Sequence, residues 1–420
     1  MRNYLYLIIF LFCSYILPFE IFCQGGSNYS IFGIGDIIQG NSAAYQALGG
    51  TQIAVPSNNS INVMNPALWS LVSTTRIQAG YRFNQNIVSG NNDQELWQNN
   101  GGLNGFSSLF NFDTTKKISA VLLLQPLSTV NYYMATPISV FNGSDTIRGK
   151  NSYKGSGGLS SLTLGLGTKT FDWLYLGASF DVIFGELQHN TYTVFTSDYT
   201  TNYTIKQLDD ISTIGFKLGM YINPFEPLGI GFSYEYIGNT TIDSKSEYVY
   251  PVSLGDVNQP LIDNSKVIRS IETSMPQYLG AGLSYNISNK IMLACDYLLG
   301  KYSTMNINKT SNVKFKDLKK ISFGISKLGN PNYYAPLKEK FVYKLGAYYE
   351  DLYYSINDHD INEIGISAGL QWPLSRTANI DIALVFGQHG TTDFDLLKEN
   401  FGRLIVDISL GDTWFKKRRR

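Results

Sequence analysis

The segment LGIGFSYEY, residues Leu228–Tyr236, alternates strictly between large apolar side chains and small or polar ones. One set of alternate positions carries Leu228, Ile230, Phe232, Tyr234 and Tyr236. The other set carries Gly229, Gly231, Ser233 and Glu235. Because successive side chains of a β-strand point to opposite sides of the sheet, this pattern predicts a strand with two different faces.

The same alternation returns along most of the chain, at Leu174–Gly185, Ile214–Tyr221, Ile364–Trp372, Asn379–Gly387 and Leu404–Gly411. The second face is rich in Gly and Ser and carries isolated charges, namely Asp181, Lys217, Glu235, Asp296, Lys344, Glu350 and Asp407. The outward face of a soluble sandwich usually carries many more charges. A small polar face suits the lumen of a barrel, and a large apolar face, on which Cys295 also falls, suits lipid. We therefore predict a transmembrane β-barrel.

The chain divides into about fourteen such strands, which we place at 74–89, 103–112, 118–141, 154–171, 174–197, 203–225, 228–252, 269–288, 291–306, 313–330, 338–357, 360–375, 378–393 and 398–417. Tight turns, such as Glu226–Pro227, alternate with longer polar loops, such as Gly90–Gly102 and Ser253–Arg269. This alternation is typical of outer-membrane barrels, which have short periplasmic turns. We place aromatic girdles at Trp173, Tyr221, Tyr285, Trp372, Trp414 and Phe415. Since lipid offers no hydrogen bonds, the sheet must close, and the predicted fold class is an all-β antiparallel barrel.

The composition agrees with an exported membrane protein. Of the 420 residues, 16 % are charged, and 33 basic residues balance 33 acidic ones. This balance excludes the basic face that a nucleic-acid partner needs. Residues 1–24 begin with a positive charge and continue with an apolar stretch, which predicts a signal peptide and, with the barrel, a location in the bacterial outer membrane. Only Cys295 remains after that peptide, so no internal disulfide is expected.

Residues 25–73 precede the first strand and do not alternate. They are rich in small residues, and Gly40–Gly50 predicts a short helix. Fourteen strands about 4.8 Å apart and tilted by about 40° enclose a backbone diameter of about 28 Å, which wall side chains cannot fill. We therefore predict an N-terminal hatch, or plug, over residues 25–73 inside a barrel over residues 74–420. The alternative is a loose periplasmic tail.

Several motifs resemble the FadL-type family of outer-membrane transporters for hydrophobic compounds such as long-chain fatty acids. The match lies in a Gly/Ala-rich stretch followed by GGTQIAVPSNNSINVMNPA just before the first strand. Later segments from KLGAYYEDLYYSIN to GDTWF look like the branch common in Bacteroidota-type bacteria. The resemblance implies a 14-stranded barrel whose hatch is anchored through Asn65, Pro66, Ala67, Gly49 and Gly50. No ligand-binding set in the loops matches the family, so the ligand-binding residues stay unknown.

Three functions follow as hypotheses. The first is passive uptake of hydrophobic compounds, with outer-membrane lipid and a hydrophobic small molecule as partners. The second is a structural or adaptor barrel of a secretion or assembly machine, because relatives in this branch include a type IX secretion component. Secretion-machinery proteins would then be the partners. The third is a porin for polar solutes, which requires an open lumen.

The sequence contains no clear motif for catalysis or metal binding. His189, His359 and His389 fall near the predicted outer ends of strands or in outer loops. The motif DHD at Asp358–Asp360 is too short for a metal site, which needs three or four converging ligands. No motif fixes a nucleophile near His389. We therefore expect neither enzymatic activity nor a metal or cofactor.

Overall fold

The computed structural model describes residues 25–90, 95–113, 117–141, 143, 146–196, 202–254, 257–288, 290–307, 312–330, 332 and 334–413. The predicted signal peptide and the girdle residues Trp414 and Phe415 lie outside this range. The described strands form one antiparallel sheet. None of the helices in the described residues is long and apolar enough to cross a membrane.

Fourteen strands form the wall of a closed barrel. Ten are continuous: β2 (Thr75–Ser89), β3 (Glu95–Asp113), β6 (Thr146–Phe171), β7 (Leu174–Phe195), β8 (Tyr203–Phe225), β13 (Ile291–Lys301), β16 (Val342–Ile356), β17 (His359–Pro373), β18 (Ala378–Gly390) and β19 (Lys398–Asp412). Four are interrupted: β4 (Ile118–Pro126) with β5 (Ser128–Phe141), β9 (Leu228–Ile237) with β10 (Thr240–Leu254), β11 (Val257–Thr273) with β12 (Gln277–Ser288), and β14 (Val313–Phe315) with β15 (Leu318–Lys327). β19 pairs with β2 along its whole length, which joins the last strand of the ring to the first.

The remaining elements are short. They are the 3-10 helices η1 (Asn28–Ile31), η2 (Pro66–Leu71) and η3 (Asp393–Asp395), the helices α2 (Ala43–Gln46) and α3 (Leu337–Lys340), and the strand β1 (Asp36–Ile37). β1 is not part of the ring but pairs with the start of β5. The helix α2 confirms the short helix predicted within residues 40–50.

The fourteen wall strands correspond one to one with the predicted strands, but two predicted outer loops are wrong. β3 already begins at Glu95, within the predicted loop Gly90–Gly102. β10 and β11 fill most of the predicted loop Ser253–Arg269. These segments are polar because both of their faces lie above the apolar belt. Alternation between apolar and polar side chains therefore does not mark them as strands.

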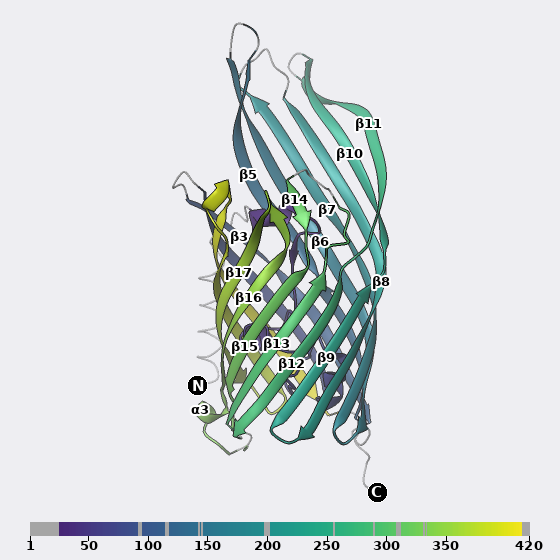
Figure 1. Cartoon of the computed structure of the whole chain (residues 1–420), viewed down its shortest axis with the longest axis vertical. Coiled ribbons are helices and arrows are strands. Elements are labelled where there is room, and N and C mark those ends of the chain that lie inside the picture. The colour runs from purple at the N-terminus through teal and green to yellow at the C-terminus, as the bar shows by residue number, and fades with distance from the viewer. Residues whose placement is uncertain are drawn as a thin grey trace.

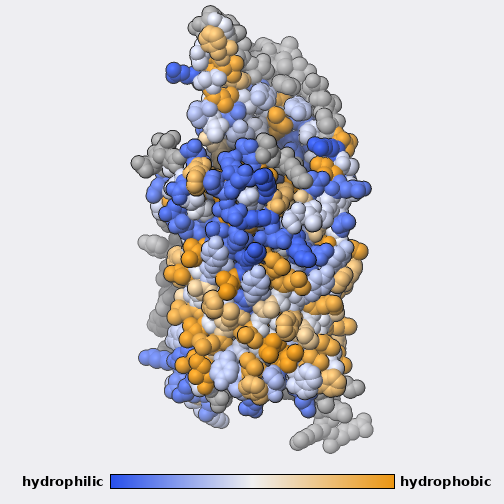
Figure 2. All heavy atoms as spheres, viewed as in Figure 1, coloured by the Kyte–Doolittle hydropathy of each residue, from blue (hydrophilic) through white to orange (hydrophobic). Residues whose placement is uncertain are grey.

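The lipid-facing surface is an apolar belt around the lower part of the barrel (Figure 2). Its exposed side chains include Leu164, Leu166, Ile214, Phe216, Leu218, Phe232, Leu279, Leu283, Phe323, Ile325, Leu345, Ile366, Leu384, Phe386 and Ile408. The predicted girdle residues Trp173, Tyr285 and Trp372 are also exposed. The girdle prediction for Tyr221 is wrong, because the register of β8 sends its odd-numbered side chains inward and leaves Tyr221 only 4 % exposed.

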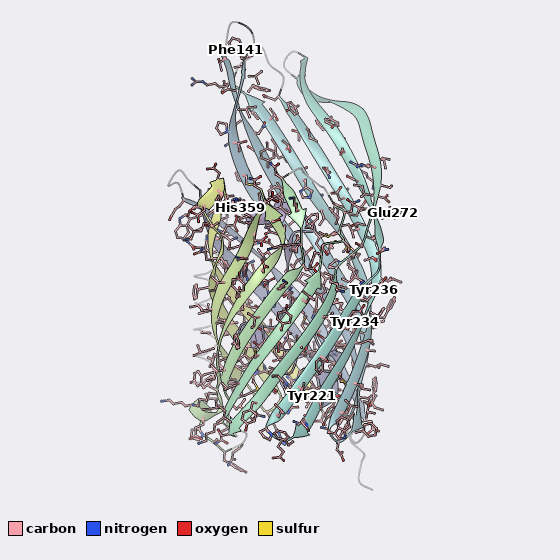
Figure 3. The ribbon with its side chains drawn as sticks, viewed as in Figure 1. Phe141, Tyr221, Tyr234, Tyr236, Glu272 and His359 are labelled. Carbon is pink, nitrogen blue, oxygen red and sulfur yellow. The ribbon has the colours of Figure 1, made fainter. Side chains whose placement is uncertain are left out.

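Several strands continue far above this belt (Figure 1). β7 contains 22 residues. At about 3.3 Å per residue and a tilt of about 40° it rises about 55 Å, roughly twice the ~25 Å apolar band of such barrels. The strands β5, β6, β7, β8, β10 and β11 build this extension, and Phe141 marks its tip, far from Tyr221, in Figure 3. Within the described residues, β11 pairs only with β10, which leaves the other edge of β11 without a strand partner.

Candidate functional site

Residues 25–73, the N-terminal segment, lie within the ring of wall strands (Figure 1). α2 contacts β17, β18 and β19, whereas η2 contacts β4, β6, β7 and β8, and η1 contacts β5. The segment therefore touches strands on different sides of the ring. Ala43, Ala67 and Trp69 are 0 % exposed, so its small and apolar residues form part of the protein interior.

Asn65 links two parts of the N-terminal segment to the wall. Its side-chain oxygen accepts a hydrogen bond from the N–H of Ala67 at 3.1 Å and so caps the start of η2. Its side-chain nitrogen donates to the carbonyl of Ile53 at 2.8 Å and to that of Met220 in β8 at 3.0 Å. All three bonds belong to a side chain that is 0 % exposed. The side chain of Asn65 thus connects Ile53 and the start of η2 to β8.

The lumen-facing glycines of β7 and β8 leave space for Asn65 and Pro66. A Cβ atom added to Gly177 would lie 2.3 Å from the carbonyl carbon of Pro66, and one added to Gly219 would lie 2.2 Å from the side-chain oxygen of Asn65. No other residue type fits at such distances without moving the segment. The glycine-rich inner face seen in the sequence is therefore the docking surface of η2.

Gly49 and Gly50 form the turn that follows α2. Their φ angles are +71° and +84°, which side-chain-bearing residues rarely adopt. The N–H of Gly49 donates to the hydroxyl of Ser367 at 2.8 Å. A Cβ on Gly49 would lie 2.6 Å from the carbonyl oxygen of Ala347, so this turn also presses directly against the wall.

Buried carboxylates of the wall hold backbone N–H groups of the N-terminal segment. Asp296 accepts from Gln52 at 2.6 Å and Ile53 at 2.7 Å, Asp407 accepts from Ala43 at 2.7 Å, and Glu399 accepts from Asn28 at 2.7 Å. Two lysines act in the opposite sense, since Lys344 donates to the carbonyl of Ala44 at 2.9 Å and Lys217 to that of Val63 at 3.1 Å. Charge-assisted hydrogen bonds are stronger than neutral ones, and here they bind the segment to the wall.

The wall ladder is interrupted between β3 and β5. β3 pairs with β4 as far as Phe106, opposite Leu124. At Gly105 the backbone turns to φ +119°, and within the described residues no pairing joins the rest of β3 to β5. A glycine inside a strand often marks such a break. The upper part of this seam therefore lacks a continuous ladder of backbone hydrogen bonds.

The N-terminal segment closes this seam. The N–H of Gly26 donates to the carbonyl of Asn131 in β5 at 2.7 Å. From the other side, the side-chain nitrogen of Gln98 in β3 donates to the carbonyl of Tyr133 in β5 at 2.7 Å and to the side chain of Asn28 at 3.2 Å. The seam is thus held by one wall glutamine and by residues that precede the barrel.

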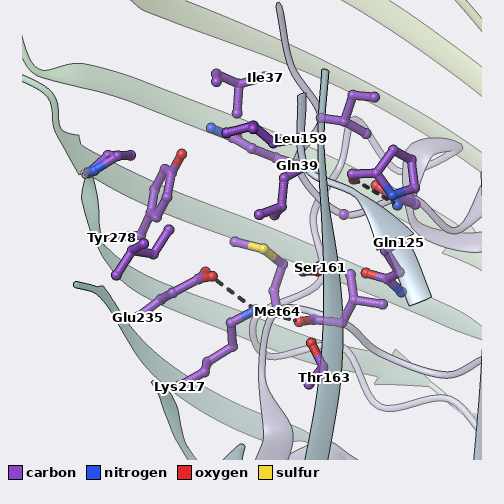
Figure 4. A pocket seen from close by; sticks show the side chains of 18 of the residues that line it. Ile37, Gln39, Met64, Gln125, Leu159, Ser161, Thr163, Lys217, Glu235 and Tyr278 are labelled. Atoms are coloured by element: carbon purple, nitrogen blue, oxygen red, sulfur yellow. Dashed lines mark hydrogen bonds and ion pairs between the residues drawn. The ribbon is translucent and has the colours of Figure 1, made fainter. Parts of the chain in front are cut away.

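A cavity lies between the N-terminal segment and the wall beside this seam (Figure 4). Its volume is about 50 Å³. The apolar lining consists of Ile34, Ile37, Ile38, Val63, Met64, Leu123, Pro126, Leu127, Leu159, Ile237, Met275, Pro276 and Tyr278. The other lining residues are Gln39, Gly40, Asn41, Gln125, Ser161, Thr163, Lys217 and Glu235. Leu127 sits where β4 gives way to β5, so the cavity reaches the interrupted strand.

The histidines do not gather at this cavity. The ring of His189 lies 2.8 Å from the hydroxyl of Tyr132, and His389 lies 3.3 Å from the carboxylate of Glu363. His359 lies near the upper end of the barrel in Figure 3, where β17 begins. In the part of the chain that the structure describes, no group of three His, Cys, Asp or Glu side chains is placed to hold a metal.

Sequence reasoning missed the cavity and the seam. The cavity residues come from the N-terminal segment, from β4, β6, β8, β9 and β12, and from the links before β5 and β12, which are far apart along the chain. One signal was available, because the Asn104–Gly105 pair inside an alternating strand indicates a bulge or kink. Gln98 fell within a predicted loop and gave no signal of its own.

Comparisons with known proteins bear on the fold. No curated protein matches the chain in sequence. The structure resembles a FadL homologue of Pseudomonas aeruginosa, with a TM-score of 0.60 and 11 % identity over 91 % of this chain and 100 % of that one. It also resembles the toluene transporter TodX of Pseudomonas putida (TM-score 0.58, 12 % identity, 91 % and 100 % covered) and the toluene transporter TbuX of Ralstonia pickettii (TM-score 0.55, 14 % identity, 89 % and 98 % covered). The chain therefore has the fold of these outer-membrane barrels, in agreement with its apolar belt and an outer-membrane location.

A match to a family model assigns the chain to a family, which is a more specific statement than its fold. A family model described as BamG matches residues 3–420. This name differs from the FadL-type family that the sequence motifs resemble, while the fold agrees with that resemblance. Membership of a Bacteroidota branch stays a prediction. The match extends over nearly the whole chain, and the protein belongs to the BamG family.

Proposed function

We propose that this protein is a passive, non-enzymatic outer-membrane channel for small hydrophobic compounds. The observation that carries the proposal is the apolar cavity between the N-terminal segment and the wall. Sites for hydrophobic ligands are concave, mostly apolar and equipped with a few polar groups. The lining of the cavity fits this description, and the cavity reaches the interrupted strand of the wall. The toluene transporters of the same fold support the proposal.

In this proposal the N-terminal segment acts as a hatch. The rings of Tyr302 and Tyr353 belong to a buried cluster and stack with centroids 4.4 Å apart. In this proposal the wall-to-segment hydrogen bonds hold the path through the lumen shut. We place the route of the ligand at the seam between β3 and β5, because within the described residues no strand pairing joins these two strands.

Two neighbouring leucines of β4 provide a matched test. Leu123 lines the cavity and is 2 % exposed, whereas Leu124 points to lipid and is 45 % exposed. Leu123→Trp would fill the cavity, and Leu124→Trp would add the same volume on the lipid side. Uptake of a radiolabelled aromatic hydrocarbon is measured in cells that produce each variant and in cells that lack the protein.

We expect Leu123→Trp to lower the protein-dependent uptake at least about fivefold, since the bulky ring removes ligand-binding volume. Leu124→Trp should leave uptake unchanged. Surface levels and heat-modified migration in gels confirm that both barrels fold. Uptake that is the same in cells with and without the protein would refute the transport proposal.

The extension above the apolar belt favours a second candidate function, an adaptor barrel in a secretion or assembly machine. Channels need no sheet about 30 Å above the membrane, and the unpartnered edge of β11 offers backbone groups to an added strand. Purification of the native protein under mild detergent tests this. A variant with a shortened β10–β11 hairpin should lose a stably bound partner while the barrel still folds. If the full-length protein purifies alone, the adaptor function is wrong.

A further inference from the structure

A groove lies on the lipid-facing side of the wall, over β12, β13, β15 and β16, the strands that face the viewer in Figure 1. Its volume is about 600 Å³, within the range of sites that bind small molecules. It is bordered by the large apolar side chains Leu283, Tyr285, Leu293, Phe323, Ile325 and Leu345, all of which are exposed. Because these residues belong to the apolar belt, the groove opens toward the acyl chains of the membrane and not toward the lumen.

Strand register explains the shape of the groove. The pairing of β12, β13, β15 and β16 places Leu283, Cys295, Phe323 and Ala347 in one row across the four strands. Cys295 and Ala347 carry the two short side chains of this row, and both line the groove. They therefore form its floor, and a flexible apolar chain can lie along it.

Lysine side chains lie at the end of the groove that is nearest to the tight turns, which is the periplasmic end. Lys327 follows Ile325 on the same face of β15 and is exposed. Its ammonium lies 5.3 Å from the centroid of the Tyr343 ring on β16. Lys290 is close by, because the N–H of Leu328 donates to the carbonyl of Lys290 at 2.7 Å. Two lysines thus meet where the apolar floor of the groove ends.

A third lysine, Lys338, joins them from α3. This helix packs beside the end of β15, because the N–H of Asn330 donates to the carbonyl of Glu339 at 2.8 Å. The carboxylate of Glu339 accepts a hydrogen bond from the side chain of Asn330 at 2.9 Å. Among the described residues, no ion pair engages Lys290, Lys327 or Lys338. These three lysines, the basic rim, therefore carry positive charge that is available to a ligand.

We propose that the groove binds an anionic phospholipid of the periplasmic leaflet, with one acyl chain over Cys295 and Ala347 and the headgroup at the basic rim. The apolar lining suits an acyl chain, and lysines at a membrane surface attract anionic headgroups. Lysine stems lie along apolar surface while their ammonium groups stay in water, which is the geometry that a headgroup phosphate needs. The site lies outside the lumen, so it goes beyond the proposed channel function and does not depend on it.

The test compares phosphatidylglycerol and phosphatidylcholine with the same acyl chains, because the first lipid has a net negative charge and the second has none. Native mass spectrometry of the detergent-purified protein counts the bound lipid molecules during a titration with each. The variants are Lys327→Gln and a triple variant that also contains Lys290→Gln and Lys338→Gln. Lys319→Gln is the matched control, because Lys319 is exposed on the same face of β15 at its opposite end.

We expect the unaltered protein to bind phosphatidylglycerol at least about tenfold more tightly than phosphatidylcholine. Lys327→Gln should weaken phosphatidylglycerol binding about fivefold, which is the effect of one lysine at an anionic membrane surface. The triple variant should bind both lipids alike, and Lys319→Gln should behave like the unaltered protein. Unchanged phosphatidylcholine binding shows that the lysine variants are folded.

A second pair of variants tests the groove itself. Ala347→Phe fills the floor of the groove, whereas Ala368→Phe places the same ring on β17, where Ala368 is exposed but does not line the groove. Ala347→Phe should lower the affinity for both lipids at least about fivefold, because the ring takes the place of the acyl chain. Ala368→Phe should leave both affinities unchanged. Heat-modified migration in gels confirms that both barrels fold.

Each of the following results would overturn the lipid site. If the unaltered protein binds both lipids alike, or if the triple variant keeps the preference for phosphatidylglycerol, the basic rim does not recognise the headgroup. If Ala347→Phe binds both lipids as tightly as the unaltered protein does, the acyl chain lies elsewhere. If the protein forms a dimer that Ala347→Phe abolishes, a second copy of this chain occupies the groove. None of these measurements depends on uptake through the channel.

Discussion

Replacing Asn65 with alanine should release the N-terminal segment from the wall. The change removes three side-chain hydrogen bonds, to Ala67, Ile53 and Met220, of which only the bond to Met220 joins the segment to the wall. Such a bond contributes about 1 kcal/mol net, so the docked state loses about 1 kcal/mol relative to the undocked one. A tenfold change in population corresponds to about 1.4 kcal/mol, and the undocked population should therefore rise about fivefold.

A buried cysteine reports this population. Ser60 lies in the N-terminal segment and is 0 % exposed. Ser60→Cys is introduced in a Cys295→Ser background, and the rate of maleimide labelling is measured in isolated outer membranes. When docking and undocking are fast relative to labelling, the rate follows the undocked population. Asn65→Ala should then label about fivefold faster, and the protein without the reporter gives the background.

Asn223 provides the matched control. Its side chain donates to the carbonyls of Phe225 and Leu228 at the turn between β8 and β9, away from the N-terminal segment. Asn223→Ala also removes asparagine side-chain hydrogen bonds, one exposed and one half-buried, yet it should leave labelling at Ser60→Cys unchanged. Equal labelling rates for Asn65→Ala and Asn223→Ala would show that Asn65 does not hold the segment in place.

Three other predictions use the same labelling reaction or a simple companion assay. Gly177→Val should speed labelling, because its Cβ would overlap Pro66, while Gly102→Ala, with no atom within 4 Å of its Cβ, should not. Gln98→Ala removes the hydrogen bond from β3 to the Tyr133 carbonyl across the seam and should raise ligand passage in the uptake assay; unchanged uptake would place the route elsewhere. Burial raises the pKa of Asp36, on β1 of the N-terminal segment, from 3.8 to about 7. The docked segment therefore holds a proton that the released one gives up, so docking weakens as the pH rises from about 4 to about 7, and Asp36→Asn should remove this part of the pH dependence of labelling.

The wall of the barrel can be predicted from the sequence, because an outward side chain contacts lipid and does not depend on a particular neighbouring residue. Phe232 in LGIGFSYEY needs no particular neighbour to be stable outside, and Gly231 needs none to face inward. Alternation therefore predicts strands, faces and closure residue by residue. The lumenal positions of Asp296 and Asp407 followed from the same rule. The alternation rule fails above the apolar belt, because β10 and β11 do not contact lipid there.

Only the tertiary structure shows the contacts that join residues across the lumen. Tyr221 points inward because of the register of β8, and Gly105 breaks the wall only where β3 parts from β4. The pairing of Lys217 with Glu235, and the cavity that this pair lines, depend on where the N-terminal segment stops against the wall. These contacts join residues that are distant in sequence, and their distances are set by ring curvature and strand register. No local pattern of residues encodes those two quantities, so the candidate site had to be found in the folded chain.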